Sequence, residues 1–141
     1  MDSLAAGITI QKCAGKADVP SVPKKILIVD DERHVRELIS KFLSPRGYTV
    51  LLAGNGEEGM TSIRSERPDL VFLDIIMPGK DGLEVLQDIK RDYPDLPVII
   101  FSALHEEETA KEAIRLGAYD YMTKPFKLES LLKDFIERIL G

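Results

Sequence analysis

Five polar side chains in this 141-residue chain follow directly on short apolar runs. Asp30 and Asp31 end the first run, Asp74 the second, Ser102 the third, and Lys124 a fourth, weaker one. If these runs are parallel strands of one sheet, their carboxyl ends meet at a single edge, where open α/β sheets bind ligands. Carboxylates, a hydroxyl and an ammonium gathered there predict a site for a divalent cation and a phosphoryl group.

The chemistry of such a site is specific. Three carboxylates brought together raise one another's pKa unless a cation joins them, and oxygen ligands of this kind suit Mg²⁺. A carboxylate can also attack phosphorus and form an acyl phosphate. Mg²⁺, the Lys124 ammonium and the Ser102 hydroxyl or backbone N–H groups would then neutralise the phosphoryl oxygens. The residues therefore predict phosphoryl transfer to an aspartate.

Each of these residues also has an ordinary interpretation on its own. Asp30 or Asp31 could cap a helix, Ser102 could be a turn residue, and a Lys-Pro pair such as Lys124 with its neighbour usually has no special role. Their joint occurrence after four strands of one predicted sheet favours the functional interpretation.

The elements that must position these residues alternate along the chain. The predicted strands are rich in apolar residues, and three of them are continuous runs typical of strands covered on both faces; they span 26–29, 48–53, 70–73, 98–101 and 118–123. The predicted helices have apolar residues at three- and four-residue spacing and span 32–43, 55–67, 81–92, 106–116 and 128–140. Capping boxes are expected at Asn55 with Glu58 and at Asp81 with Glu84.

Five strands alternating with five helices predict an α/β fold with a doubly wound, five-stranded parallel sheet. The fifth strand carries polar residues and belongs at an edge, and the second strand can take the other edge. The predicted strand order is therefore 2-1-3-4-5, and the topological switch point falls between strands 1 and 3, at Asp30, Asp31 and Asp74.

Composition excludes several other classes of protein. The net charge is −5 and no basic block is present, which argues against direct contact with nucleic acid. No apolar run is long enough for a membrane span, no secretory signal is evident, and Cys13 is the one cysteine, so a soluble cytoplasmic protein is expected. Residues 1–23 show no sustained period and are interpreted as a flexible N-terminal extension of a domain over 24–141.

Four segments of the chain resemble the response regulator receiver domain of two-component systems, over about residues 24–141. The segments match the family's motifs in order and spacing, and they span 26–31, 69–82, 97–103 and 117–126. The resemblance implies a flavodoxin-like fold similar to that of chemotaxis receivers. It also implies a phosphoacceptor switch module rather than a turnover enzyme.

The resemblance implies a role for each matching residue. Asp74 would accept a phosphoryl group from a phosphohistidine on a histidine kinase or phosphotransfer protein. Asp31 would bind Mg²⁺ directly and Asp30 through water, with help from Asp74 and the Ile76 carbonyl.

Three further residues would respond to the phosphoryl group. Lys124 would pair first with the acids and then with the phosphoryl group, and its bond to Pro125 is a candidate for the cis isomer. Ser102 would hydrogen-bond a phosphoryl oxygen, and Tyr121 would move inward behind it.

Particular residues argue against three alternative interpretations. The stretch 54–59 matches G-x-G-x-x-G, but it follows the second strand and carries two glutamates where a pyrophosphate would lie, so a glycine-rich helix start is favoured. A dehalogenase-type phosphatase would need a second aspartate where Ile76 stands. A phosphorylation-independent interaction module of the same fold is the remaining alternative, and the intact set of acids, Ser102 and Lys124 argues against it.

The resemblance also implies a switching face. The face that controls an effector domain or partner protein is expected to consist of helix 106–116, strand 118–123 and helix 128–140. A homodimer through this face is possible, although Asp134 stands where DNA-binding relatives often carry an arginine for a dimer salt bridge. The chain stops at Gly141 after the last helix, so it would be either a stand-alone receiver or a fragment of a longer regulator or hybrid kinase.

Overall fold

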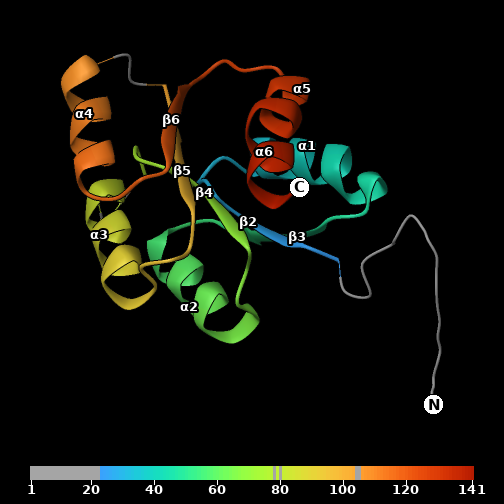
Figure 1. Cartoon of the computed structure of the whole chain (residues 1–141), viewed down its shortest axis with the longest axis horizontal. Helices are drawn as coiled ribbons and strands as arrows, with labels where there is room; N and C mark the ends of the chain where they lie inside the picture. Colours follow the sequence, from blue (N-terminus) through green and yellow to red (C-terminus); the bar gives the residue numbers. More distant parts are fainter. Residues whose placement is uncertain (1–22, 78, 80, 104–105) are drawn as a thin grey trace.

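The computed structural model of this chain describes residues 23–77, 79, 81–103 and 106–141. The expected extension over 1–23 therefore lies almost wholly outside the described residues. Strands and helices alternate as predicted and are labelled here as in Figure 1. The strands are β2 (Lys25–Val29), β3 (Thr49–Ala53), β4 (Leu70–Asp74), β5 (Val98–Ser102) and β6 (Asp120–Thr123). The helices are α1 (Arg33–Leu43), η1 (Ser44–Arg46), α2 (Gly56–Glu66), α3 (Gly82–Asp92), α4 (Glu107–Arg115), α5 (Leu128–Ser130), η2 (Leu131–Ile136) and α6 (Glu137–Leu140).

The five strands form one parallel sheet in the order β3-β2-β4-β5-β6. Counted along the chain this is the predicted order 2-1-3-4-5, with the second and fifth strands at the edges. The expected fold class is confirmed. Because all strands run in the same direction, their carboxyl ends lie at one edge of the sheet.

Helices cover both faces of the sheet (Figure 1). On one face lie α1 and the helical stretch α5–η2–α6, packed on one set of alternating strand residues that includes Ile28 and Phe72. On the other face α2, α3 and α4 pack on the intervening residues, such as Leu27 and Leu73. Every residue of β4 and β5 is buried, which explains why these strands read as continuous apolar runs.

Asn55 and Asp81 cap their helices as predicted, although the hydrogen bonds at each differ from those of a capping box. The Asn55 side chain accepts a hydrogen bond from the Glu58 N–H at 2.9 Å, and the Glu58 carboxylate accepts one from the Gly54 N–H at 2.7 Å. At α3 the Asp81 carboxylate accepts from the Leu83 N–H at 3.0 Å, one residue earlier than the capping box predicted. In both cases a side-chain oxygen satisfies a backbone donor that the first turn leaves unpaired.

The glycine-rich stretch at the start of α2 serves packing. A Cβ at Gly56 would lie 2.6 Å from Val85 Cγ2, and one at Gly59 would lie 3.1 Å from Val29 Cγ2. The glycines therefore let α2 approach both α3 and β2 closely, and the stretch begins a helix as predicted.

The last helix is less regular than the predicted single helix over 128–140. Its middle, η2, is a π-helix between the short α-helical pieces α5 and α6. A π-helix bonds residues five apart, so Leu131 and Leu132 can both reach the core together with Ile136, and all three are buried. Among the described residues, no helix has the combination of length and apolar character that a bilayer crossing requires.

Candidate functional site at the carboxyl edge of the sheet

The sheet brings the strand-end residues together. Asp30 follows β2, Asp74 and Ser102 are the last residues of β4 and β5, and Lys124 follows β6. Asp30, Asp74 and Ser102 are buried, although carboxylates and hydroxyls normally stay in water. Their burial is a consequence of the topology, because β2, β4 and β5 are the three inner strands of the sheet.

An acid cluster forms at this edge from Asp30, Asp31 and Asp74. One carboxylate oxygen from each lies within 4.8 Å of the others, with Asp31 exposed to solvent. Burial, and to a smaller extent the Asp30 charge, raises the pKa of Asp74 to about 6, against the lowering effect of the Lys124 ammonium. The cluster therefore holds its negative charge at a cost that a bound cation would relieve.

The Lys124 ammonium forms ion pairs with two carboxylates of this cluster. Its Nζ lies 2.7 Å from Asp30 Oδ2 and 3.2 Å from Asp74 Oδ2, and 5.0 Å from the centre of the Phe101 ring. Burial would lower the pKa of Lys124, but the hydrogen bond to Asp30 and the charges of both aspartates outweigh it and raise the pKa. The ammonium thus stays charged and is shared between two carboxylates.

Backbone N–H groups hold the other oxygen of each buried carboxylate. Asp30 Oδ1 accepts from the Glu32 N–H at 2.9 Å, and Asp74 Oδ1 accepts from the Ile76 N–H at 3.0 Å. Arg36 Nη1 donates to the Asp30 main-chain carbonyl at 2.7 Å. The two carboxylates are therefore fixed from both sides, which keeps their geometry constant before any ligand arrives.

The loop after Asp74 depends on a glycine. The Gly82 N–H donates to the Ile75 carbonyl at 3.1 Å, so the start of α3 folds back on the end of β4. A Cβ at Gly82 would lie 2.4 Å from Ile75 Cα and 2.7 Å from the Asp74 carbonyl oxygen. Because both of these are backbone atoms, any side chain at position 82 would displace Asp74.

Ser102 and Tyr121 lie on the neighbouring strands β5 and β6. Burial raises the pKa of Tyr121, and a hydrogen bond with the Ser102 side chain partly offsets that rise. The Lys124 N–H donates to the Ser102 carbonyl at 2.8 Å, which ties the end of β6 to the end of β5. The Lys124-Pro125 bond is cis, as the family resemblance suggested.

A cavity of about 270 Å³ opens onto this cluster. It is lined by Asp31, Glu32, Asp74, Ile76, Ala103 and Lys124. Asp74 is only 4% exposed, yet it forms part of the cavity wall and is therefore within reach of a small group that enters. The metal ligands that the acid cluster offers are oxygens of three carboxylates, and oxygen ligands of this kind suit Mg²⁺.

Glu32 belongs to this site but is not among the site residues predicted from the sequence. Its Oε1 lies 3.6 Å from Lys124 Nζ, and it lines the cavity. The available signal was the run of three acids from Asp30 to Glu32, of which the third reads equally well as the first residue of a helix.

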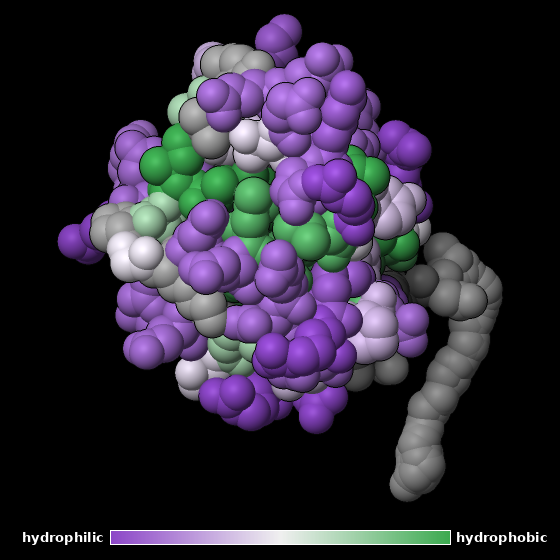
Figure 2. All heavy atoms as spheres, turned by 90° about the vertical axis from the view of Figure 1, so that its left-hand side faces the viewer, coloured by the Kyte–Doolittle hydropathy of each residue, from purple (hydrophilic) through white to green (hydrophobic). Residues whose placement is uncertain are grey.

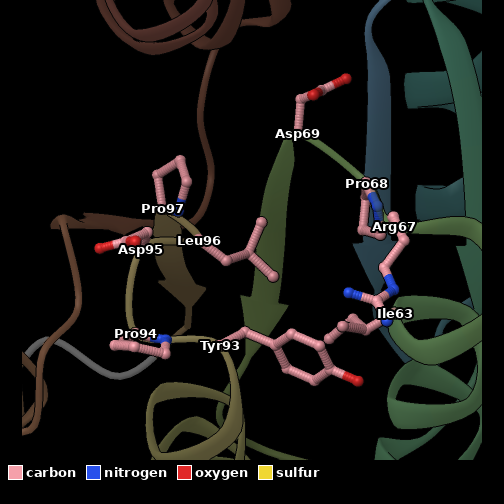
Figure 3. A pocket seen from close by; sticks show the side chains of 9 residues that line it. All are labelled: Ile63, Arg67, Pro68, Asp69, Tyr93, Pro94, Asp95, Leu96 and Pro97. Atoms are coloured by element: carbon pink, nitrogen blue, oxygen red, sulfur yellow. The ribbon is translucent and has the colours of Figure 1, made fainter.

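A second and larger cavity lies at the opposite, amino edge of the sheet. It has a volume of about 410 Å³ and is lined by Ile63, Arg67, Pro68, Asp69, Tyr93, Pro94, Asp95, Leu96 and Pro97 (Figure 3). The Arg67 guanidinium lies 5.5 Å from the centre of the Tyr93 ring, and Asp69 points away from the cavity. We call it the proline groove; it contains none of the residues predicted to carry chemistry.

Comparisons with known proteins agree with this geometry. Residues 26–136 match the family model described as "Response regulator receiver domain". The chain therefore belongs to the response regulator receiver family, the signalling domains of two-component systems rather than turnover enzymes. The acids Asp30, Asp31 and Asp74 with Lys124 are consistent with the phosphoaspartate and Mg²⁺ site of such domains.

Individual relatives show the same likeness. The chain is 45% identical over 109 residues to the probable C4-dicarboxylate response regulator DctR of Bacillus subtilis, covering 76% of this chain and 48% of that protein. It is 44% identical over 111 residues to the response regulator MprA of Mycolicibacterium vanbaalenii, covering 79% of this chain and 48% of that protein. The chain thus spans about half the length of these curated relatives.

Solved structures extend the comparison to three dimensions. The receiver domain of NtrX from Brucella abortus superposes with a TM-score of 0.76 at 43% identity, covering 82% of this chain and 97% of that chain. A CheY-like receiver domain protein from Methanospirillum hungatei gives 0.79 at 29% identity, covering 83% and 94%.

Proposed function

We propose that this chain is a phosphoacceptor: Asp74 takes a phosphoryl group from the phosphohistidine of a histidine kinase or phosphotransfer protein. The observation that carries the proposal is the position of Asp74, which lines a cavity beside two other carboxylates while Lys124 Nζ lies 3.2 Å from its Oδ2. A carboxylate at this place is accessible to a phosphoryl group. It is also paired with an ammonium that can then bind the negative charge of the phosphoryl group. The receiver unit that performs this reaction is proposed to span residues 24–141.

The proposed reaction is an in-line transfer. A carboxylate oxygen of Asp74 forms a bond to phosphorus, the bond between phosphorus and the imidazole nitrogen of the donor breaks, and that nitrogen keeps the electron pair and takes up a proton. The product is an acyl phosphate on Asp74 and a neutral histidine. The Lys124 ammonium neutralises charge that develops on a phosphoryl oxygen, and the Ser102 hydroxyl donates to another.

Asp30, Asp31 and Asp74 are the residues that would hold Mg²⁺, together with the Ile76 main-chain carbonyl. The ion would supply a further positive charge for the phosphoryl oxygens. Its positive charge would also oppose the effects of burial and of the Asp30 charge, which raise the pKa of Asp74, so that the nucleophile is more fully ionised at neutral pH.

The switch would act through α4, β6 and the helical stretch α5–η2–α6. Ser102 shares a hydrogen bond with Tyr121, so a phosphoryl group that attracts the Ser102 hydroxyl would release the tyrosine to a new position. Figure 2 shows the side of the molecule that carries α3 and α4, where apolar atoms form a band between polar ones. Ile114 of α4 and Tyr119 before β6 are about half exposed, which favours contact with an effector domain, a partner protein or a second copy.

The test compares the wild-type chain with Asp74→Asn in the presence of Mg²⁺. Beryllofluoride should shift the backbone NMR signals of Ser102 and Tyr121 in the wild type, and acetyl phosphate should add the mass of one phosphoryl group. Asp74→Asn should lose both responses, while Asp88→Asn on α3 should keep them. If the Asp74 variant still responds, the phosphoacceptor is wrongly assigned. If the wild type responds to neither reagent, the fold serves as a phosphorylation-independent interaction module.

A further inference from the structure

Glu32 occupies an unusual position at the mouth of the site. It is the residue before α1, its side chain is 54% exposed, and its Oε1 lies 3.6 Å from Lys124 Nζ. It shares the cavity wall with Asp31 and Asp74. A fourth carboxylate therefore faces the Lys124 ammonium, in addition to the three that form the acid cluster.

The backbone explains why the Glu32 side chain turns to Lys124. A residue at this position usually caps the helix by accepting a hydrogen bond from an N–H of the first turn, but the Glu32 side chain makes no such bond. Instead its own N–H donates to Asp30 Oδ1 at 2.9 Å. The buried carboxylate of Asp30 thus anchors the Glu32 backbone beside Lys124, and the Glu32 carboxylate pairs with the same ammonium that Asp30 binds.

This arrangement has two electrostatic consequences. Part of the charge of Lys124 is neutralised from the solvent side, where a phosphoryl group must enter. In addition, the exposed Glu32 carboxylate adds a negative charge to the cavity wall, and it would keep this charge when Asp30, Asp31 and Asp74 hold Mg²⁺. A small anionic donor that diffuses in alone is repelled by this charge. A phosphohistidine on a docked protein is held in place by the other contacts between the two proteins, so the same repulsion matters less.

We propose that Glu32 is a donor-selectivity residue, which slows phosphorylation of Asp74 by small free anions and so favours a donor delivered by a protein. The inference depends on the proposed phosphoacceptor function. Glu32 acts as a positioning and charge-setting residue through Lys124 and does not bind the phosphoryl group itself.

The experiment measures the rate of Asp74 phosphorylation at saturating Mg²⁺ with two donors. Acetyl phosphate enters as a dianion and leaves acetate, and phosphoramidate enters as a monoanion and leaves ammonia. Glu32→Gln should speed the reaction with acetyl phosphate about three- to tenfold and the reaction with phosphoramidate less, because the repulsion scales with the donor's charge. At about 1 M salt the gain should largely disappear.

Two further variants separate charge from structure. Glu32→Asp keeps the charge and should stay near the wild-type rate. Glu37→Gln makes the same substitution on the exposed face of α1, where the carboxylate pairs with Arg33 at 2.9 Å, and should leave both rates unchanged. A gain that is equal for both donors, or that persists in high salt, would overturn the electrostatic selectivity.

A readout independent of phosphorylation completes the test. The NMR signals of the Lys124 side chain should shift in Glu32→Gln and remain in place in Glu37→Gln. If Asp74 of the wild type is phosphorylated but Glu32→Gln changes neither the rates nor these signals, the selectivity proposal fails while the phosphoacceptor assignment stands. If Asp74 of the wild type is not phosphorylated by either donor, the proposed function itself fails.

Discussion

The carboxyl and amino edges of the sheet differ in how deeply their charged groups are buried and in what these groups pair with. At the carboxyl edge, Asp30 and Asp74 are buried and share the Lys124 ammonium. At the amino edge the charged groups near the sheet are exposed or satisfied by backbone: the Lys25 N–H donates to Asp69 Oδ2 at 2.9 Å, and Lys25 Nζ donates to the Glu66 carbonyl at 2.9 Å. The proline groove beside them is lined mainly by apolar and proline residues.

The difference shows that cavity size is a poor guide to chemistry in this fold. The proline groove, at about 410 Å³, is larger than the cavity of about 270 Å³ at the acid cluster, and yet the smaller of these two contains the carboxylate whose pKa is raised to about 6. Burying charges at the carboxyl edge lowers stability but produces groups that respond strongly to a cation or a phosphoryl group. The amino edge is expected to contribute to stability alone, and substitutions at three positions test this contrast.

The largest effect is expected from Lys124→Ala. Removal of the ammonium leaves Asp30 and Asp74 buried without their cation, which should lower the free energy of unfolding by about 3 kcal/mol at pH 7 without Mg²⁺. Urea denaturation measures the loss, and added Mg²⁺ should recover part of it. Lys127→Ala, an exposed lysine in the same loop, should change stability little. Equal losses in the two variants would contradict a special role for the buried pair.

Asp74→Asn is expected to raise the free energy of unfolding, in contrast to Lys124→Ala. The pKa of Asp74 is about 6 in the folded protein and lower in the unfolded chain, so ionising it at neutral pH opposes folding. Its contribution to stability should fall as pH rises from about 4 to about 6 and stay constant above. Without Mg²⁺ the variant should be more stable than the wild type by about 2 kcal/mol at pH 7 and equal to it near pH 4. A difference that does not depend on pH would contradict the raised pKa.

The smallest effect concerns the proline groove. Arg67 has a φ of 52°, in the left-handed region that a side chain disfavours, and its guanidinium lies over Tyr93. Arg67→Ala loses the contact with Tyr93 and keeps the strain, whereas Arg67→Gly relieves the strain. Thermal unfolding should therefore find the glycine variant more stable than the alanine variant by about 1 kcal/mol. Both should respond normally to beryllofluoride, and a lost response would show that the two edges are coupled.

Much of the architecture could be predicted because its signals are local. The burial of β4 and β5 on both faces leaves continuous apolar runs, and the cap at Asn55 follows from side-chain chemistry within one turn. The π-helical middle of the last helix could not be predicted, because it depends on how Leu131 and Ile136 meet the finished sheet. The choice of Leu83 rather than Glu84 as the donor to Asp81 likewise depends on backbone angles set by the fold.

The order of residues along the chain specifies which groups follow each strand, and so which chemistry one edge of the sheet can hold. How these groups share their charges depends on the tertiary fold. Lys124 lies 94 residues from Asp30 in sequence and 2.7 Å from it in space, and the raised pKa of Asp74 arises from burial that no local pattern contains. From the sequence, Glu32 is predicted only to begin a helix, whereas in the structure its Oε1 lies 3.6 Å from the same ammonium. The reason is physical: periodicity and capping act over one turn or strand, whereas charge coupling and desolvation depend on what the whole chain packs around each group.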